Sequence, residues 1–365
     1  MSSIEVRPFR RGDREQLTSL VNAHVAAVVP GMGVSVATVL SQLEREPGEF
    51  IVDPWVRERA TLVAVEHDRI AAAAHLLWYA SDDRVSPAYR NTGEIRWLLF
   101  WPEGPASASA YWTDATRAAE LLIAACIRKL GEWEVSSLEA GGELPAPGVY
   151  GVPEQWPHVR ALYERAGFRH TGQTEAVYLI RVEDVPEPSG PPLAGLCIRR
   201  SVGLNGTRLS AVFTDSTVLT DNTVLTDSTV SADSTMYDGD TEFGGDTALA
   251  EDTALAEDTV TGVAGYIEME IFEEGERLAR HGGWADIGNL HVAEPYRRRG
   301  VASWLLAHAA EWLSLAQVGR LLTYAWLSGT DPGGQNDDGY RAFLTASSFR
   351  ELTRTARGWD REMPQ

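Results

Sequence analysis

One continuous stretch, residues 284–306, constrains the fold of this chain more than any other segment. Trp284–Val292 has the residue types and alternation of a β-strand, and an amphipathic helix is predicted to begin near Val301. The helix carries an apolar stripe at i, i+3, i+4, i+7 and i+11, formed by Ala302, Leu305, Leu306, Ala309 and Leu313. Such a stripe is typical of a helix packed on a sheet, so the stretch predicts a strand–loop–helix unit.

The loop of this unit is basic. Arg297, Arg298 and Arg299 precede Gly300 at the start of the expected helix. The first N–H groups of a helix have no acceptor within it, and the helix dipole favours anions there, so the loop predicts a phosphate or pyrophosphate site. Gly300 allows close backbone approach or an unusual φ. The loop has no Gly-Lys-Ser/Thr and no Gly-x-Gly-x-x-Gly, which excludes a Walker loop and a dinucleotide fingerprint.

The pattern Arg297-x-x-Gly300-x-Ala302, after a strand with Leu290-His291-Val292 and then Pro295, resembles the acyl-CoA loop of the GNAT N-acetyltransferase superfamily. The resemblance implies acetyl-CoA as cosubstrate and no metal. It assigns cosubstrate binding to Leu290, His291, Val292, Arg297, Arg298, Arg299, Gly300, Val301 and Ala302. It also implies that backbone N–H groups near Leu290–Val292 point at the thioester oxygen.

The first half of the chain carries a second resemblance to the same superfamily. Tyr163–Phe168 is similar to its last-helix motif Tyr-x-x-x-Gly-Phe, and the predicted elements follow the GNAT order, with the last strand of the unit at 176–182. The resemblance implies an α/β (α+β) fold of two tandem GNAT-like domains, each a mixed, mostly antiparallel twisted sheet flanked by helices. Residues 102–112 contain no cation where the family has its pyrophosphate loop. We therefore expect the first half to bind CoA poorly or not at all.

Composition predicts the domain boundaries. Residues 1–185 form the degenerate first domain, the proline-rich segment 186–195 a stiff linker, and residues 196–365 the acyl-CoA domain. No pair of helices is expected between the first two strands of the second domain, in contrast to the first. Hexad repeats fill an acidic insertion at 214–260, which has too few apolar residues to build a core. We interpret it as the extension of a hairpin tip, and the alternative is an acidic arm for a cationic partner.

The strand before the basic loop carries two candidate bases. Asp286 is the first candidate, because the resemblance places a catalytic acidic residue at this position in some members; orientation of the amine or an ion pair are the alternatives. His291 is the rival, since its ordinary pKa suits proton transfer near neutrality. Strand alternation puts it on the face opposite Asp286 unless a bulge intervenes. Glu268 and Glu270 share one face of the preceding strand, as lining of an amine pocket or as surface charges.

The last helix is expected to supply the proton for the leaving thiolate, for which the family often uses a tyrosine. Leu344 stands where this tyrosine is expected, and Ser348 where a glycine is expected. Tyr340, one helical turn earlier on the same face, is the candidate substitute, and a plain core or surface tyrosine is the alternative.

The totals exclude several classes of partner. A net charge of −20 argues against nucleic acid or an anionic membrane and favours a cationic substrate. No window is apolar enough for a membrane span, and the start of the chain lacks a signal-peptide layout, so a cytoplasmic location is expected. Cys126 and Cys197 have no metal-type spacing.

Taken with the resemblance, these features predict an N-acetyltransferase that moves an acetyl group from acetyl-CoA to a primary amine by direct attack in the C-terminal domain. The acceptor is a small-molecule or peptide amine, and homo-oligomerisation is left open. The alternative is a catalytically weak acyl-CoA-binding sensor or regulatory module, which Leu344 and Ser348 favour.

Overall fold

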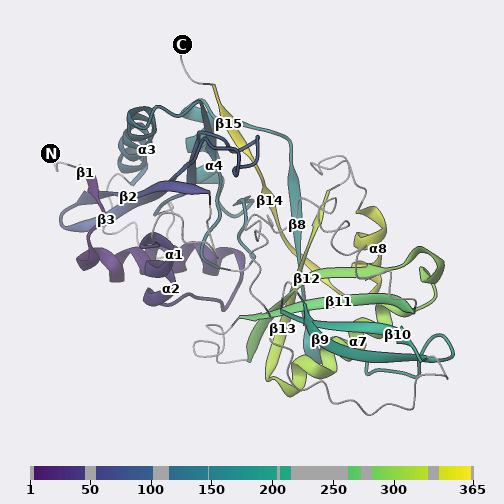
Figure 1. Ribbon diagram of the computed structural model, residues 1–365. Coiled ribbons are helices and arrows are strands. Elements are labelled where there is room, and N and C mark those ends of the chain that lie inside the picture. The colour runs from purple at the N-terminus through teal and green to yellow at the C-terminus, as the bar shows by residue number, and fades with distance from the viewer. Residues whose placement is uncertain are drawn as a thin grey trace, which may run out of the picture.

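The computed structural model describes residues 4–45, 55–101, 115–146, 148–203, 206–214, 262–272, 282–327 and 337–362. The loop at 102–112 and nearly all of the acidic insertion lie outside these ranges. The described strands form two mixed, mostly antiparallel sheets, one in each half of the molecule, and helices flank both (Figure 1). This confirms the expected fold class.

The first sheet has the order β1-β2-β3-β4-β5-β15-β7. Its strands are β1 (Glu5–Pro8), β2 (Val56–Glu66), β3 (Arg69–Tyr79), β4 (Thr92–Phe100), β5 (Ser137–Ala140), β7 (Arg169–His170) and β15 (Trp359–Arg361). The helices of this half are η1 (Arg11–Asp13), α1 (Arg14–Val28), α2 (Val36–Leu43), α3 (Ala115–Glu132) and α4 (Pro157–Arg165). On β2 and β3, α3 lies on one side and α1 and α2 lie on the other (Figure 1). His67 and Asp68, at φ 50° and 61°, form a tight turn between β2 and β3.

The second sheet has the order β6-β14-β8-β13-β12-β11-β10-β9. Its strands are β6 (Val152–Pro153), β8 (Thr174–Arg181), β9 (Leu196–Gly203), β10 (Gly206–Phe213), β11 (Val263–Phe272), β12 (Gly283–Val292), β13 (Val318–Trp326) and β14 (Arg350–Ala356). The helices are η2 (Val182–Asp184), η3 (Glu294–Tyr296), α7 (Val301–Leu315) and α8 (Asp338–Ala346). β9 and β10 pair directly as neighbours, so the helical insertion of the first half is absent between them, as expected. None of the described helices is both long and apolar enough to cross a membrane.

The two sheets exchange strands. We expected residues 176–182 to close the first unit, but β8 lies in the second sheet, between β13 and β14. In return β15, near the end of the chain, lies in the first sheet between β5 and β7. β8 and β14 run between the two halves (Figure 1). The prediction missed this because the pattern of a strand does not identify its pairing partner.

The halves also share one hydrophobic core. Trp284, Leu322, Val177 and Ala356 of the second sheet belong to the same buried cluster as the core of the first half. They lie on the sheet face opposite α7, whose own apolar side packs on the other face with Ile267, Ala285 and Leu321. The first half therefore covers part of the sheet face on which the second half has no helices of its own among the described residues.

Candidate active site

The strands β12 and β13 diverge in the middle of the second sheet. They pair in parallel only from Gly283–Val318 to Asp286–Leu322. One residue later the register of β12 against β11 shifts, so that Gly288 forms a bulge between Ile287 and Asn289. From this point β12 follows β11 while β13 continues along β8. The result is a V-shaped opening with its vertex at Asp286.

The basic loop lies at the open end of this V. Arg297 is anchored, because its Nε donates to the carbonyl oxygen of Val292 at 2.9 Å, at the end of β12. Arg297, Arg298, Arg299 and Gly300 are exposed. Arg298 and Gly300 have positive φ values of 58° and 85°, and Gly300 is the N-cap of α7 without a side-chain cap. Its left-handed conformation explains the glycine, and the first N–H groups of α7 have no acceptor within the helix.

The inter-domain linker borders this loop. Trp304 in the first turns of α7 donates its indole N–H to the carbonyl oxygen of Ser189 at 3.1 Å. A Cβ on Gly300 would come within 3.4 Å of Pro192. These contacts hold the start of α7 from one side.

Asp286 is fully buried at the vertex of the V. Tyr324 donates its hydroxyl to Oδ2 at 3.4 Å, and Oδ1 has no hydrogen-bond partner among the described residues. Glu270 lies opposite Asp286 on β11. Burial raises the pKa of Asp286 well above its usual range, and the charge of Glu270 raises it further. Burial also raises the pKa of Glu270. Asp286 is thus a stronger proton acceptor than an ordinary aspartate carboxylate.

The bulge at Gly288 brings His291 to the same face as Asp286. On β11, Tyr266 pairs with His291 and Glu270 pairs with Asp286, and these partners are four residues apart. The simple alternation that placed the two side chains on opposite faces was therefore wrong. The rings of His291 and Tyr266 stack at 5.6 Å, and Asn289 donates to the Tyr266 hydroxyl at 3.1 Å.

Glu268 is buried beside this face but is paired. Arg208 on β10 donates to its Oε1 at 2.6 Å, and the same guanidinium lies over the Tyr266 ring at 4.2 Å. Of the two glutamates considered from the sequence, Glu270 therefore faces the V vertex, whereas Glu268 stabilises the wall of the site.

Tyr340 on α8 lies on the other side of the V. Its hydroxyl is 2.6 Å from Oγ1 of Thr323, the residue of β13 just beyond the last pairing position with β12. Burial raises the pKa of this phenol, so it keeps its proton near neutral pH. Leu344 occupies the position of Tyr163 in the first half: each carbonyl accepts the N–H five residues later at 3.0 Å, from Phe349 and Phe168 respectively.

Two tyrosines that were not singled out in the sequence extend the site: Tyr324 contacts Asp286, and Tyr150 contacts Tyr324. The two rings pack edge to face at 5.1 Å, and a hydrogen bond joins the two hydroxyl groups. Tyr150 comes from a loop of the first half that is rich in glycine and proline. No local signal could have placed it here, because its position depends on the packing of the two halves.

The first half contains the corresponding V but fills it with its own chain. β4 and β5 pair in parallel only up to Ile95–Ala140, and a register shift makes Arg96 the bulge residue. The N–H of Gly141 then donates to the carbonyl oxygen of Ile95 at 2.9 Å, and the N–H of Glu143 donates to that of Arg96 at 3.1 Å. Tyr163 closes the site by donating to the carbonyl oxygen of Gly141 at 2.8 Å.

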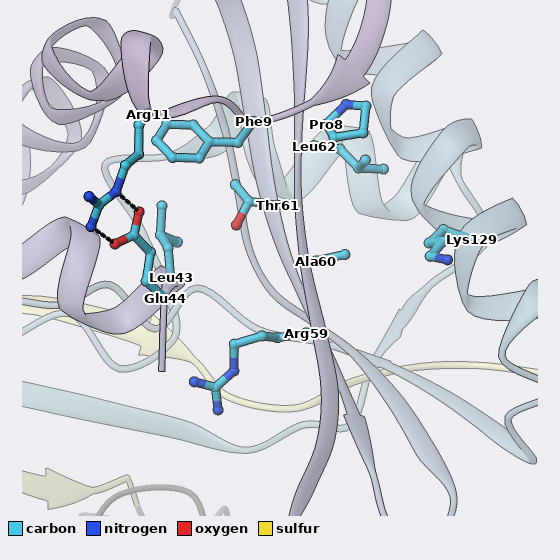
Figure 2. A pocket seen from close by; sticks show the side chains of 10 residues that line it. All are labelled: Pro8, Phe9, Arg11, Leu43, Glu44, Arg59, Ala60, Thr61, Leu62 and Lys129. Atoms are coloured by element: carbon cyan, nitrogen blue, oxygen red, sulfur yellow. Dashed lines mark hydrogen bonds and ion pairs between the residues drawn. The ribbon is translucent and has the colours of Figure 1, made fainter. Parts of the chain in front are cut away.

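A separate cavity of about 550 Å³ lies in the first half, between the end of β1, β2, the end of α2 and α3 (Figure 2). Its walls are formed by Pro8, Phe9, Arg11, Leu43, Glu44, Arg59, Ala60, Thr61, Leu62 and Lys129. Arg11 and Glu44 in this wall are ion-paired, with Nε 2.7 Å from Oε1. None of these residues belongs to either V, so the cavity is not part of the site described above.

Comparisons with known proteins agree with this geometry. Residues 226–330 match the model of the acetyltransferase (GNAT) family. No curated protein matches the sequence. A tandem GNAT protein from the clavulanic acid biosynthesis pathway has a similar structure, with a TM-score of 0.57 at 13% identity over 100% of both chains.

Two other solved structures are similar over 98% of this chain. One is a fungal glucosamine N-acetyltransferase region of a β-N-acetylglucosaminidase, with a TM-score of 0.56, 12% identity and 38% of that chain covered. The other is a GCN5-related N-acetyltransferase from Sphaerobacter thermophilus, with a TM-score of 0.52, 12% identity and 95% of that chain covered. At these identities the likeness shows the fold.

Proposed function

Because the chain is a tandem GNAT protein by fold and carries a GNAT acetyltransferase domain over residues 226–330, we propose that it is an acetyl-CoA-dependent N-acetyltransferase. The second half performs the reaction on a primary amine by direct attack. The observation that carries this proposal is the divergence of β12 and β13, with a buried carboxyl at its vertex and an arginine-rich helix start at its mouth.

The residues at the mouth of the V fit the pyrophosphate of CoA. Arg297, Arg298 and Arg299 are exposed, and the first N–H groups of α7 have no acceptor within the helix. Leu290, His291 and Val292 form the end of β12, where it diverges from β13. Val301 and Ala302 lie in the first turn of α7. When bound, acetyl-CoA supplies the acetyl group as a thioester, whose carbonyl oxygen the backbone N–H groups of β12 polarise.

Asp286 on β12 and Tyr340 on α8 carry out the two proton transfers of the reaction. The amine nitrogen forms a bond to the carbonyl carbon, and the carbon–sulfur bond breaks. Asp286 accepts the proton that the amine loses, directly or through a water molecule, and Tyr340 donates a proton to the departing sulfur. The raised pKa of Asp286 suits a base, and the raised pKa of Tyr340 keeps the donor protonated.

A thiol-release assay tests the proposal. The protein is saturated with acetyl-CoA and offered a mixed panel of primary amines, with glucosamine included because one structural relative carries that name. Amine-dependent release of CoA thiol and an acetylated amine are expected. Acetyl-CoA binding without release above background for any amine would instead support the sensor alternative, to which the buried Leu344 in the tyrosine position points.

The acidic chain favours a cationic acceptor and disfavours nucleic acid as a partner. The net charge is −20, and Glu270 and Asp286 add carboxyl groups at the V itself. Primary amines that carry a second positive charge are therefore expected to give lower KM values than primary amines of the same size without it, and this difference is expected to shrink at high salt.

A further inference from the structure

A loop of the first half extends into the site of the second half. Gly148 donates its backbone N–H to the hydroxyl oxygen of Tyr324 at 3.2 Å, across a sequence separation of 176 residues. Tyr150, two residues later in the same loop, packs edge to face on Tyr324 and shares a hydrogen bond with its hydroxyl. Tyr324 in turn contacts Asp286. Tyr324 therefore connects the loop of the first half to Asp286 at the vertex of the V.

The donors and acceptors of this group have only one consistent arrangement when Asp286 is ionised. A backbone N–H can only donate and an ionised carboxylate can only accept. Tyr324 must then accept from Gly148 and donate its single proton to Oδ2 of Asp286. Since that proton is used, Tyr150 is the donor in the bond between the two hydroxyl groups. Burial raises the pKa of both phenols, so both protons are present.

We propose that Tyr150 is a positioning residue for catalysis, which acts through Tyr324 to hold Asp286 in its ionised, proton-accepting form. The inference rests on the proposed function of Asp286 as base. Two donors on the oxygen of Tyr324 polarise its O–H and direct the proton to Asp286, since hydrogen bonds in a chain strengthen one another by roughly 10–30%. The degenerate half thus supplies part of the active site although its own V is filled.

Other groups that face Asp286 act in the opposite sense. Glu270 on β11 raises its pKa by charge repulsion. Asp286 in turn contributes to the raised pKa of Tyr340 on α8, of Tyr150 and of Tyr324. Glu175 on β8 also acts on the two tyrosines. Among these groups, Tyr324 is the side chain that donates to Asp286 and favours its ionised form.

Tyr150→Phe, Tyr324→Phe and the double variant test the chain of bonds. Because a hydrogen bond contributes roughly 0.5–1.5 kcal/mol and one pKa unit is about 1.36 kcal/mol, Tyr324→Phe is expected to raise the pKa of Asp286 by up to about one unit. The acidic limb of kcat/KM then moves to higher pH, with up to about tenfold lower activity below it. Tyr150→Phe is expected to shift the limb by a few tenths of a unit in the same direction. KM for acetyl-CoA is expected to stay unchanged.

The double variant separates positioning from packing. If Tyr150 acts through Tyr324, then Tyr150→Phe adds no further shift in the Tyr324→Phe background. A shift of the same size in both backgrounds, or none in the wild-type background, would overturn the proposal. Tyr163→Phe is the matched control, since Tyr163 donates to a backbone carbonyl in the filled V of the first half. It is expected to leave the pH limb in place.

An NMR titration of carboxyl-labelled aspartate gives a readout that does not require activity. Asp286→Asn identifies the resonance, and its pKa is compared between wild type, Tyr150→Phe and Tyr324→Phe. The expected order is wild type lowest and Tyr324→Phe highest. An unchanged pKa in Tyr150→Phe contradicts the role of Tyr150. If the variants raise the pKa of Asp286 but the wild-type protein transfers no acetyl group to any amine, the hydrogen-bond chain is supported and the proposed function is rejected.

Discussion

The two V-shaped strand pairs of this molecule start from the same geometry but differ in what occupies the strand edges. In each, parallel pairing stops at a carboxyl residue or directly after it, at Asp286 and Glu94, and a bulge follows at Gly288 and Arg96. In the first half the bulge residue pairs with Glu143, and the chain at 141–143 bonds to the free strand edge. In the second half, Gly288 is exposed and β13 turns away.

The carboxyl groups show the same contrast. Glu94 accepts the Tyr79 hydroxyl at 2.6 Å and an Arg96 N–H at 3.4 Å. Asp286 accepts a single long hydrogen bond and has one oxygen without a partner among the described residues. A buried polar atom without a partner costs stability, so it persists where it has a use. At the first V the carboxyl group therefore has its hydrogen bonds completed, whereas at the second V one carboxyl oxygen is left without a partner among the described residues.

The largest expected effect distinguishes the two carboxyl groups. Asp286→Asn removes the proton acceptor, and acetyl transfer is expected to fall at least about 100-fold, the lower range for general base catalysis. Glu94→Gln changes the corresponding residue of the filled V and is expected to leave kcat/KM within about twofold. Steady-state kinetics with one amine measures both. Equal losses in the two variants would mean that the Vs do not differ in chemistry.

The second effect concerns CoA binding. Arg297→Ala combined with Arg299→Ala is expected to raise the Kd for acetyl-CoA at least about tenfold, because charge-assisted contacts to phosphate are lost. Calorimetry of the wild type is expected to give one CoA per chain, since only the second V is open among the described residues. Arg84→Ala, in an exposed ion pair of the first half, serves as the control. Two CoA molecules per chain would show that the two halves do not differ in CoA binding.

A smaller effect concerns stability and pH. Burial raises the pKa of Asp286 in the folded state above its unfolded value of 3.8. Its contribution is therefore favourable at low pH and is lost as pH rises through the folded pKa. Near pH 8 the free energy of unfolding of Asp286→Asn is expected to exceed that of the wild type by roughly 1–3 kcal/mol. Near pH 4 the difference is expected to be smaller. Urea titrations at the two pH values measure this.

Asp82→Asn is the control for that experiment. The hydrogen bond from Arg84 lowers the pKa of Asp82, so its ionised form is the favoured one in the folded protein. The sign is therefore reversed, and this variant is not expected to gain stability near pH 8. A gain in both variants would point to a general effect of reduced negative charge.

The smallest effect tests the closure of the first V. Tyr163→Phe removes the donor to the carbonyl oxygen of Gly141. The free energy of unfolding is expected to fall by about 0.5–1.5 kcal/mol, the net value of one hydrogen bond. CoA affinity and stoichiometry are expected to remain those of the wild type. The appearance of a second, weak CoA site would show that the bond from Tyr163 is what prevents the first V from binding CoA.

The parts of the fold that depend on local pattern could be predicted from the sequence. The helix start at Val301 and the glycine at the loop appear where expected. The face of His291 could not, because one extra residue in β12 reverses alternation, and only Gly288 hints at it. The tyrosines at Asp286 could not either, since Tyr150 and Tyr324 come together only through packing between the halves.

The exchange of β8 and β15 means that neither half is complete without the other. A fragment that begins at residue 186 would lack β8, leaving β13 and β14 with unpaired edges in the middle of its sheet. Exposed strand edges of this kind promote aggregation. Unfolding of the intact chain is thus expected to be one cooperative transition despite its bilobal form. A fragment containing the second sheet would therefore have to include residues 174–181.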